Sequence, residues 1–190
     1  MAEEAAGVIE ALAIAPVAAV GYSDGGNLLL HLALRRPELL GSMVLISANF
    51  HHDALHADNT AILDAATSPD GPLADGYAER SPVGCDHWPI VAAKSLKMGF
   101  QEPTLRAEEL SAITVPTLVI GRDDDQFPTT HTVALYDALA DARLAIVPNS
   151  SHLVAFEQPR TLAHLILEFL QHPTRQPTMF PIKRPAATGA

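Results

Sequence analysis

Apolar positions along the first part of the chain follow two periods, one typical of helices and one typical of buried strands. Residues 2–13 carry apolar side chains at the spacing i, i+3, i+4 and i+7, which predicts an amphipathic helix. The apolar run at 17–20 is short and unbroken and ends at Gly21, as expected of a strand buried in a parallel sheet. Residues 25–34 predict a buried helix and residues 42–47 a second strand. The order helix, strand, helix, strand favours an α/β fold.

The same alternation returns in the second half of the chain. Residues 115–121 predict a third strand, and the segment from Thr129 predicts an amphipathic helix after it. Residues 144–147 predict a fourth strand, and the stripe over 162–170 predicts a final amphipathic helix. We therefore expect a mostly parallel sheet of about four strands flanked by helices.

Between these halves the alternation stops, and breakers such as the run 68–72 separate short helical patterns. Helices are predicted at 57–66, 88–98 and 104–110, so the segment is interpreted as a helical insertion. The predicted organisation is a core at 1–48, an insertion at 49–113, a second part of the core at 114–172 and a flexible, proline-rich tail at 173–190.

Composition limits the classes of function. The 190 residues are enough for one domain, and 22 Asp and Glu against 12 Lys and Arg give a net charge of −10. A field of that sign repels phosphate backbones and anionic lipid surfaces, so neither nucleic acid nor a membrane is expected as a partner. Cys85 is the only cysteine, and the N-terminal segment is acidic where an export signal needs positive charge. The sequence therefore predicts a cytoplasmic protein.

The segment Gly21-Tyr22-Ser23-Asp24-Gly25 joins a predicted strand to a predicted helix. This context is the one required of a nucleophile elbow, a strained turn that presents a serine hydroxyl at the end of a strand. Glycine at 21 and 25 is expected to avoid a clash within the turn. The Asp24 backbone N–H would then face a developing oxyanion at the helix N-terminus. The alternative is a tight glycine turn whose serine only caps the helix.

A serine nucleophile needs a base, and the base needs an orienting carboxylate. Candidates for both follow the last two predicted strands, in the loops 121–128 and 148–152. The carboxyl ends of parallel strands meet along the same edge of a sheet, so these loops are expected to converge on Ser23.

Three segments together resemble those of α/β-hydrolase fold enzymes. These segments are GYSDGG, VPTLVIGRDDDQFP and VPNSSHLVAFEQP. The resemblance implies Ser23 as nucleophile, His152 as base and Asp124 as the orienting acid, since the family acid lies three residues after a glycine and four before a proline. Asp123 and Asp125 directly flank this position and stay open as alternatives. Asp53, after the second predicted strand, is a further alternative because some members carry the acid there.

The resemblance implies a serine hydrolase of small carboxylic esters or lactones, without a cofactor, in which the insertion caps the pocket. Tyr22, Asn49, Phe50, Trp88 and Met98 are the predicted substrate-binding residues. For Trp88 and the other large apolar side chains of the insertion, packing in a small core of their own is an equal alternative.

A metal site is not expected. His51, His52 and His56 have a spacing that zinc can use. The family resemblance instead implies that this segment begins the insertion and that His51, with Asn49 and Phe50, lines the pocket. The acidic run at 123–125 lacks the alternating ligands and the later glutamate of a calcium loop.

The resemblance also implies several strands ahead of the first predicted helix, and this chain opens on that helix. The strand at 17–20 is then expected at a sheet edge, with backbone groups open to pairing. The family's second oxyanion donor comes from a loop after an earlier strand, so impaired catalysis is expected. The alternative function is a non-catalytic remnant that associates, for example as a homodimer, through this edge.

Overall fold

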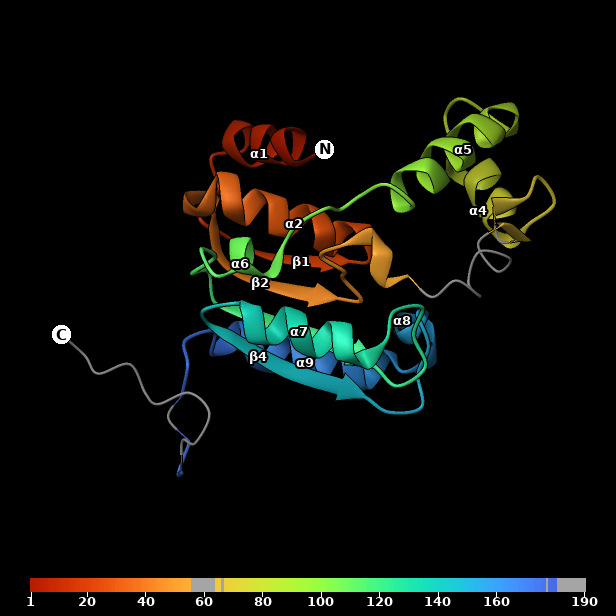
Figure 1. Ribbon diagram of the computed structural model, residues 1–190. Helices are drawn as coiled ribbons and strands as arrows, with labels where there is room; N and C mark the ends of the chain where they lie inside the picture. The colour runs from red at the N-terminus through yellow and green to blue at the C-terminus, as the bar shows by residue number, and fades with distance from the viewer. Residues whose placement is uncertain (56–63, 66, 177, 181–190) are drawn as a thin grey trace.

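A parallel sheet of four strands organises the described part of the molecule (Figure 1). The structure, a computed structural model, describes residues 1–55, 64–65, 67–176 and 178–180. The sheet contains, in spatial order, β1 (Val17–Tyr22), β2 (Leu40–Ile46), β3 (Thr117–Arg122) and β4 (Ala142–Val147). Every neighbouring pair is parallel. The predicted fold class is confirmed, and the strand ends differ from the predicted ones by no more than two residues.

Helices connect the strands and cover the sheet. The helices near the sheet are α1 (Ala2–Ala11), α2 (Asp24–Arg35), α6 (Ala107–Leu110), α7 (Thr129–Ala138), α8 (Val154–Glu157) and α9 (Pro159–Gln171), with 3-10 turns η1 (Pro37–Leu39) and η2 (His52–Ala54). Helices α2 and α7 pack on one face of the sheet, and α9 packs on the other. Two separate hydrophobic layers result.

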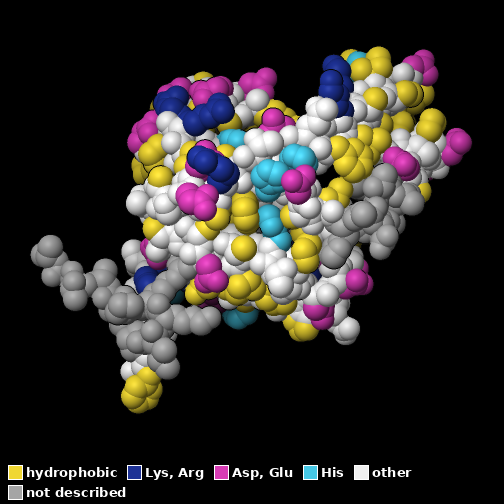
Figure 2. Space-filling model, in the orientation of Figure 1, with side chains coloured by type: hydrophobic (Ala, Val, Ile, Leu, Met, Phe, Trp, Pro, Cys, Tyr) yellow, Lys and Arg dark blue, Asp and Glu magenta, His cyan; other side chains and the backbone are white. Residues whose placement is uncertain are grey.

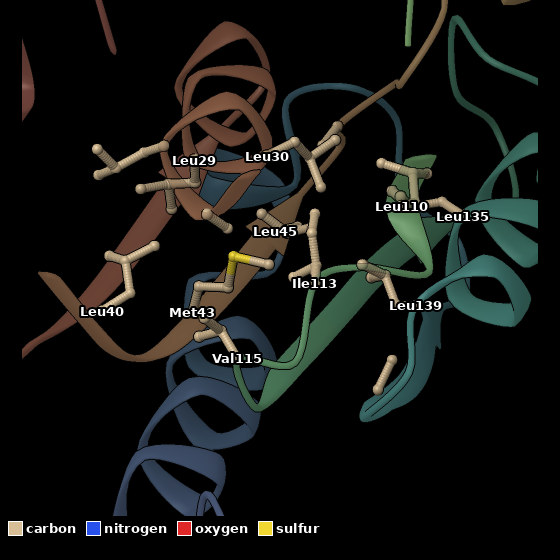
Figure 3. Close-up of a cluster of buried hydrophobic side chains, with 14 of the residues drawn as sticks. Leu29, Leu30, Leu40, Met43, Leu45, Leu110, Ile113, Val115, Leu135 and Leu139 are labelled. Carbon is tan, nitrogen blue, oxygen red and sulfur yellow. The ribbon is translucent and has the colours of Figure 1, made fainter. Parts of the chain in front are cut away.

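Strand alternation assigns side chains to these layers, because successive residues of a strand point to opposite faces. In β2, Met43 and Leu45 join the layer under α2 and α7, whereas Val44 and Ile46 join the layer under α9. Figure 3 shows the first layer, to which α2, β2 and α7 contribute the fully buried Leu30, Leu45 and Leu135.

Strand β1 lies at an edge of the sheet of described residues, beside β2 alone. Its residues Val17 and Ala19 pack on the layer under α2. On the opposite face Ala18 is exposed and Val20 retains 48% exposure, because the layer under α9 receives Tyr22 from the end of this strand and neither of these two residues. The expected edge position of this strand is therefore observed in the described part of the chain.

The segment predicted to be an insertion, 49–113, contains α4 (Pro72–Arg80), the turn η4 (Cys85–His87) and α5 (Trp88–Gly99), besides η2 and α6. Helix α5 was predicted, whereas α4 was missed because its region contains turn formers, although proline is favoured in the first turn of a helix. The predicted helix at 104–110 is shortened to α6, because Thr104 pairs with His51 in an extended bridge. The predicted helix at 57–66 lies largely outside the described residues. In Figure 1, α4 and α5 extend away from the sheet beyond the carboxyl ends of its strands.

No helix in the described residues is long and apolar enough to cross a membrane. The described residues after His172 form no helix or strand. The carboxyl ends of β1, β3 and β4 point to the same side of the molecule, where the three loops of interest lie (Figure 1).

Candidate active site

The turn between β1 and α2 is strained at Ser23, whose φ of 53° and ψ of −121° lie outside the regions that L residues prefer. The Ser23 N–H donates to the carbonyl of Ile46 at 2.8 Å, which fixes the turn to β2. A Cβ on Gly21 would lie 2.4 Å from the Gly25 carbonyl oxygen, so glycine is required there. The expectation for Gly25 was wrong, because a Cβ there would meet nothing within 4 Å. The second close approach is instead at Gly26, against the Cβ of Ala48 at 2.7 Å.

The structure brings Ser23 and His152 together. Their Oγ and Nε2 atoms lie 3.0 Å apart. On the other side of the ring, His152 Nδ1 lies 2.9 Å from Oδ1 of Asp125. This is the serine, imidazole and carboxylate arrangement that the three loops predicted.

The acid beside His152 is Asp125, so the assignment of this contact to Asp124 was wrong. Asp124 is exposed, and its backbone N–H donates to the Ser150 carbonyl at 3.2 Å. Asp123 points to the histidine loop and accepts the backbone N–H groups of Asn149 and Ser150. Asp53 pairs with neighbouring histidines and does not contact the His152 ring.

Asp125 has a second partner, which the sequence reading missed. Its Oδ2 lies 2.8 Å from Nη2 of Arg122, and the two side chains are 3% and 0% exposed. Arg122 is the last residue of β3, where a charged residue after an apolar strand was the available signal. Burial lowers the pKa of the Arg122 guanidinium, and the charge of Asp125 opposes this shift.

The histidine loop is held from several sides. The Tyr22 hydroxyl donates to the His152 carbonyl, and the two rings meet edge to face. Glu157 accepts from both the backbone N–H and the hydroxyl of Ser151, at 2.7 Å each. Tyr22, predicted to bind substrate, therefore supports the backbone of the base through its hydroxyl.

Asp24 begins α2 directly after Ser23. The first N–H groups of a helix lack intrahelical partners, so the Asp24 N–H is available to an anion at this position. Burial raises the pKa of the Asp24 carboxyl, while the nearby His152 and a hydrogen bond from Asn27 lower it.

Two of the predicted substrate-binding residues are engaged in the structure around the site. Asn49 is buried, and its side chain accepts from Asn27 Nδ2 at 2.8 Å and donates to the His51 carbonyl at 3.1 Å. Phe50 stacks on His131 with ring centroids 4.1 Å apart, and its N–H donates to His131 Nε2. Burial, reinforced by the charge of His51, lowers the pKa of His131 to about 4. Asn49 thus ties the segment after β2 to α2.

Trp88 and Met98, the two substrate-binding residues predicted between 49 and 113, have different surroundings. Trp88 packs with Ala74 and Ala92 in the insertion's own cluster and donates its indole N–H to the Ser68 carbonyl. The structure thus places Trp88 in that local core, which corrects its interpretation as a pocket residue. Met98 lines a cavity of about 280 Å³ that also reaches Asp24.

His51, His52 and Asp53 place three donor atoms within 4.8 Å of one another. Figure 2 shows histidine side chains gathered beside acidic ones on this face. The His51 and His52 rings stack, with centroids 4.7 Å apart and planes 24° apart. The lone pair of an imidazole nitrogen lies in the plane of its ring. In two stacked rings the lone pairs are therefore nearly parallel, whereas the ligands of a tetrahedral metal ion must point toward one centre. His56 lies outside the described residues.

Residues 2–165 match the sequence model of the alpha/beta hydrolase family. This match spans most of the chain, and the chain belongs to that family. The resemblance seen in the three loops is thereby confirmed.

Individual proteins similar to this chain carry the names of hydrolases. The chain is 28% identical to the "Putative carbamate hydrolase RutD" of Variovorax paradoxus, over 90% of this chain and 71% of that protein. It is also 28% identical to the 2-hydroxymuconate semialdehyde hydrolase of Pseudomonas sp. CF600, over 88% of this chain and 66% of that protein. The fold matches the meta-cleavage product hydrolase CumD of Pseudomonas fluorescens IP01 with a TM-score of 0.68 and 24% identity, over 91% of this chain and 71% of that one.

Proposed function

We propose that this chain is a serine hydrolase that acts on small carboxylic esters or lactones. The observation that carries the proposal is the continuous contact from Ser23 Oγ to His152 Nε2, at 3.0 Å, and from His152 Nδ1 to Asp125, at 2.9 Å. Both distances are within the hydrogen-bond range that a nucleophile and its base require. Asp125 takes the role of acid in this proposal.

In the proposed reaction, Ser23 Oγ attacks the substrate carbonyl carbon while His152 Nε2 accepts the serine proton. The carbonyl oxygen becomes an oxyanion, which the Asp24 N–H at the start of α2 stabilises. The imidazolium then gives its proton to the leaving alkoxide, and the acyl-serine remains. Water, deprotonated by His152, releases the acid and restores Ser23. Asp125 holds the tautomer that carries the proton on Nδ1.

The type of bond that the chain hydrolyses is a separate part of the proposal. Relatives of this chain are named for carbamate and for 2-hydroxymuconate semialdehyde hydrolysis. An aryl carbamate therefore belongs in the assay beside short aryl esters and a lactone. The cavity that Met98 and Asp24 line extends along α2 toward Arg35, and neither Ser23 nor His152 is among its lining residues.

The test is hydrolysis of p-nitrophenyl acetate and butyrate by the wild-type chain and by Ser23→Ala. We expect Ser23→Ala to lose the activity to background, whereas Ser111→Ala, on an exposed serine outside the site, keeps it. A fluorophosphonate probe gives a second readout, because covalent labelling detects an activated serine even when turnover is slow. Equal hydrolysis and labelling of wild type and Ser23→Ala would refute the proposal.

A second candidate is association without catalysis, through β1. The observation that favours it is the edge position of β1 together with the exposed Ala18 and Val20. Unpaired backbone groups at a strand edge can pair with another chain, here a second copy. Sedimentation at micromolar concentration tests this candidate. A dimer that Val20→Lys disrupts is expected, and a monomer at all concentrations would contradict it.

A further inference from the structure

Arg122 is a charged side chain in the interior. It is 0% exposed, and alternation along β3 places it on the face shared with Leu118 and Ile120, under α8 and α9. Its ion pair in the described part of the chain is with Asp125, through Nη2, and its Nε, Nη1 and Nη2 atoms make no hydrogen bond of good geometry there. A buried charge with unused donors is costly, by several kcal/mol after relaxation. An apolar residue would fill the same place with less cost to the fold.

Asp125 lies between this guanidinium and the imidazole of His152. Oδ2 faces Arg122 at 2.8 Å, and Oδ1 faces His152 at 2.9 Å. With Arg122 present, the carboxylate charge is already balanced while His152 is neutral. A proton added to His152 therefore gives the three groups a net positive charge in a buried place. Without Arg122, the same proton would neutralise a lone carboxylate and would be bound more tightly.

We propose that Arg122 is a positioning residue that orients Asp125 toward His152 through the buried Arg122–Asp125 ion pair and whose charge opposes the addition of a proton to that imidazole. Its chemical relevance rests on the proposed hydrolase function, since a base that already carries a proton cannot accept one from Ser23. The ion pair also fixes which carboxylate oxygen turns toward His152.

The surroundings of Arg122, Asp125 and His152 include other ionisable groups, each with its own burial and partners. Tyr22, from β1, is half-buried, and burial raises the pKa of its hydroxyl, so it stays neutral. Asp24, from α2, faces His152 and would favour its protonation. Glu157, from α8, is exposed and bound to Ser151, and Asp123 is exposed and bound to the histidine loop. Arg122 is thus the buried cation that counteracts the acidic groups on this side of the site.

The test compares Arg122→Met, which removes the charge, with Arg122→Lys, which keeps it. The readout is the pH midpoint at which the His152 imidazole NMR signals move, assigned by comparison with His152→Gln. In Arg122→Met we expect the midpoint to rise by about one to three pH units, the range of effect of one nearby charge. In Arg122→Lys and in the exposed control Arg160→Met we expect a midpoint close to that of the wild type.

Arg122→Gln is the second variant, in case the methionine variant does not fold. The acid limb of the kcat/KM profile should move to higher pH together with the NMR midpoint. A folded Arg122→Met or Arg122→Gln with an unchanged midpoint would overturn the inference, because a purely structural arginine would leave it in place. A shifted midpoint in a chain that never hydrolyses ester would support the inference and refute the proposed function, so the two failures differ.

Discussion

Asp123 accepts the backbone N–H of Asn149 at 2.9 Å and so joins the loop after β3 to the loop that carries His152. Asn149 has a positive φ of 57°, a conformation that a short polar residue tolerates better than most. The three consecutive aspartates therefore have three different surroundings. Asp123 binds the neighbouring loop, Asp124 faces solvent and Asp125 faces His152.

This division predicts the effect of removing each carboxylate charge in turn. Asp125→Asn should reduce kcat by about 10⁴, because the amide favours the wrong imidazole tautomer. Asp124→Asn should leave kcat within about twofold, since its side chain is exposed. Steady-state kinetics on p-nitrophenyl butyrate check both. The opposite ranking would show that Asp124 serves as the acid.

Asp123 makes stability depend on pH in the acidic range. The hydrogen bonds from Asn149 and Ser150 lower the pKa of its carboxyl below the ordinary 3.8. Because the folded pKa is lower than the unfolded one, this contribution is present above about pH 4 and is lost as the pH falls through the folded pKa. Urea midpoints of Asp123→Asn should therefore be lower than those of the wild type at pH 7 and converge with them toward pH 3. A constant difference over this range would contradict the assignment.

His131 makes stability depend on pH in a higher range. Its folded pKa of about 4 lies below its ordinary 6.5, so the unfolded chain binds the extra proton more readily between these values. Stability should fall as the pH decreases from 6.5 to 4, and His131→Gln should reduce this slope while keeping an acceptor for the Phe50 N–H. Urea unfolding at several pH values measures the slope, with the exposed His164→Gln as control. An equal slope in wild type and His131→Gln would count against a buried neutral imidazole.

The two glycines of the elbow should respond differently to a methyl group. In Gly21→Ala the new Cβ would lie 2.4 Å from a backbone oxygen, so we expect a loss of about 1–3 kcal/mol or more. In Gly25→Ala the Cβ meets nothing within 4 Å, and alanine is the better helix former by about 0.5–1 kcal/mol. Chemical unfolding of both variants tests the pair. Equal destabilisation would mean that the turn is not as tight as described.

The sequence predicted the sheet and much of the site because both depend on local signals. Four short apolar runs identified the strands, and the glycine turn after the first identified Ser23. The choice among three adjacent aspartates depends on how two loops pair, which no spacing within one loop reveals. Arg122 was missed because its role requires a partner across a buried space.

In the segment 49–113 the sequence predicted a helix but not the packing around it. Its helix α5 was predicted from its pattern, but the environment of Trp88 depends on α4, whose start contains residues more typical of turns. The composition of such a segment indicates that it buries apolar side chains and does not indicate against which neighbour.

The edge position of β1 also affects motion. Ser23 follows this strand, and its N–H is held by Ile46 of β2, so the nucleophile is supported by backbone bonds from one side of the sheet. Local opening of an edge strand costs less than opening of a central one, and any such fluctuation would carry Ser23 away from His152. Amide hydrogen exchange along β1 would therefore report how long Ser23 and His152 stay within hydrogen-bond distance. A molecule that pairs with this edge would lengthen that time.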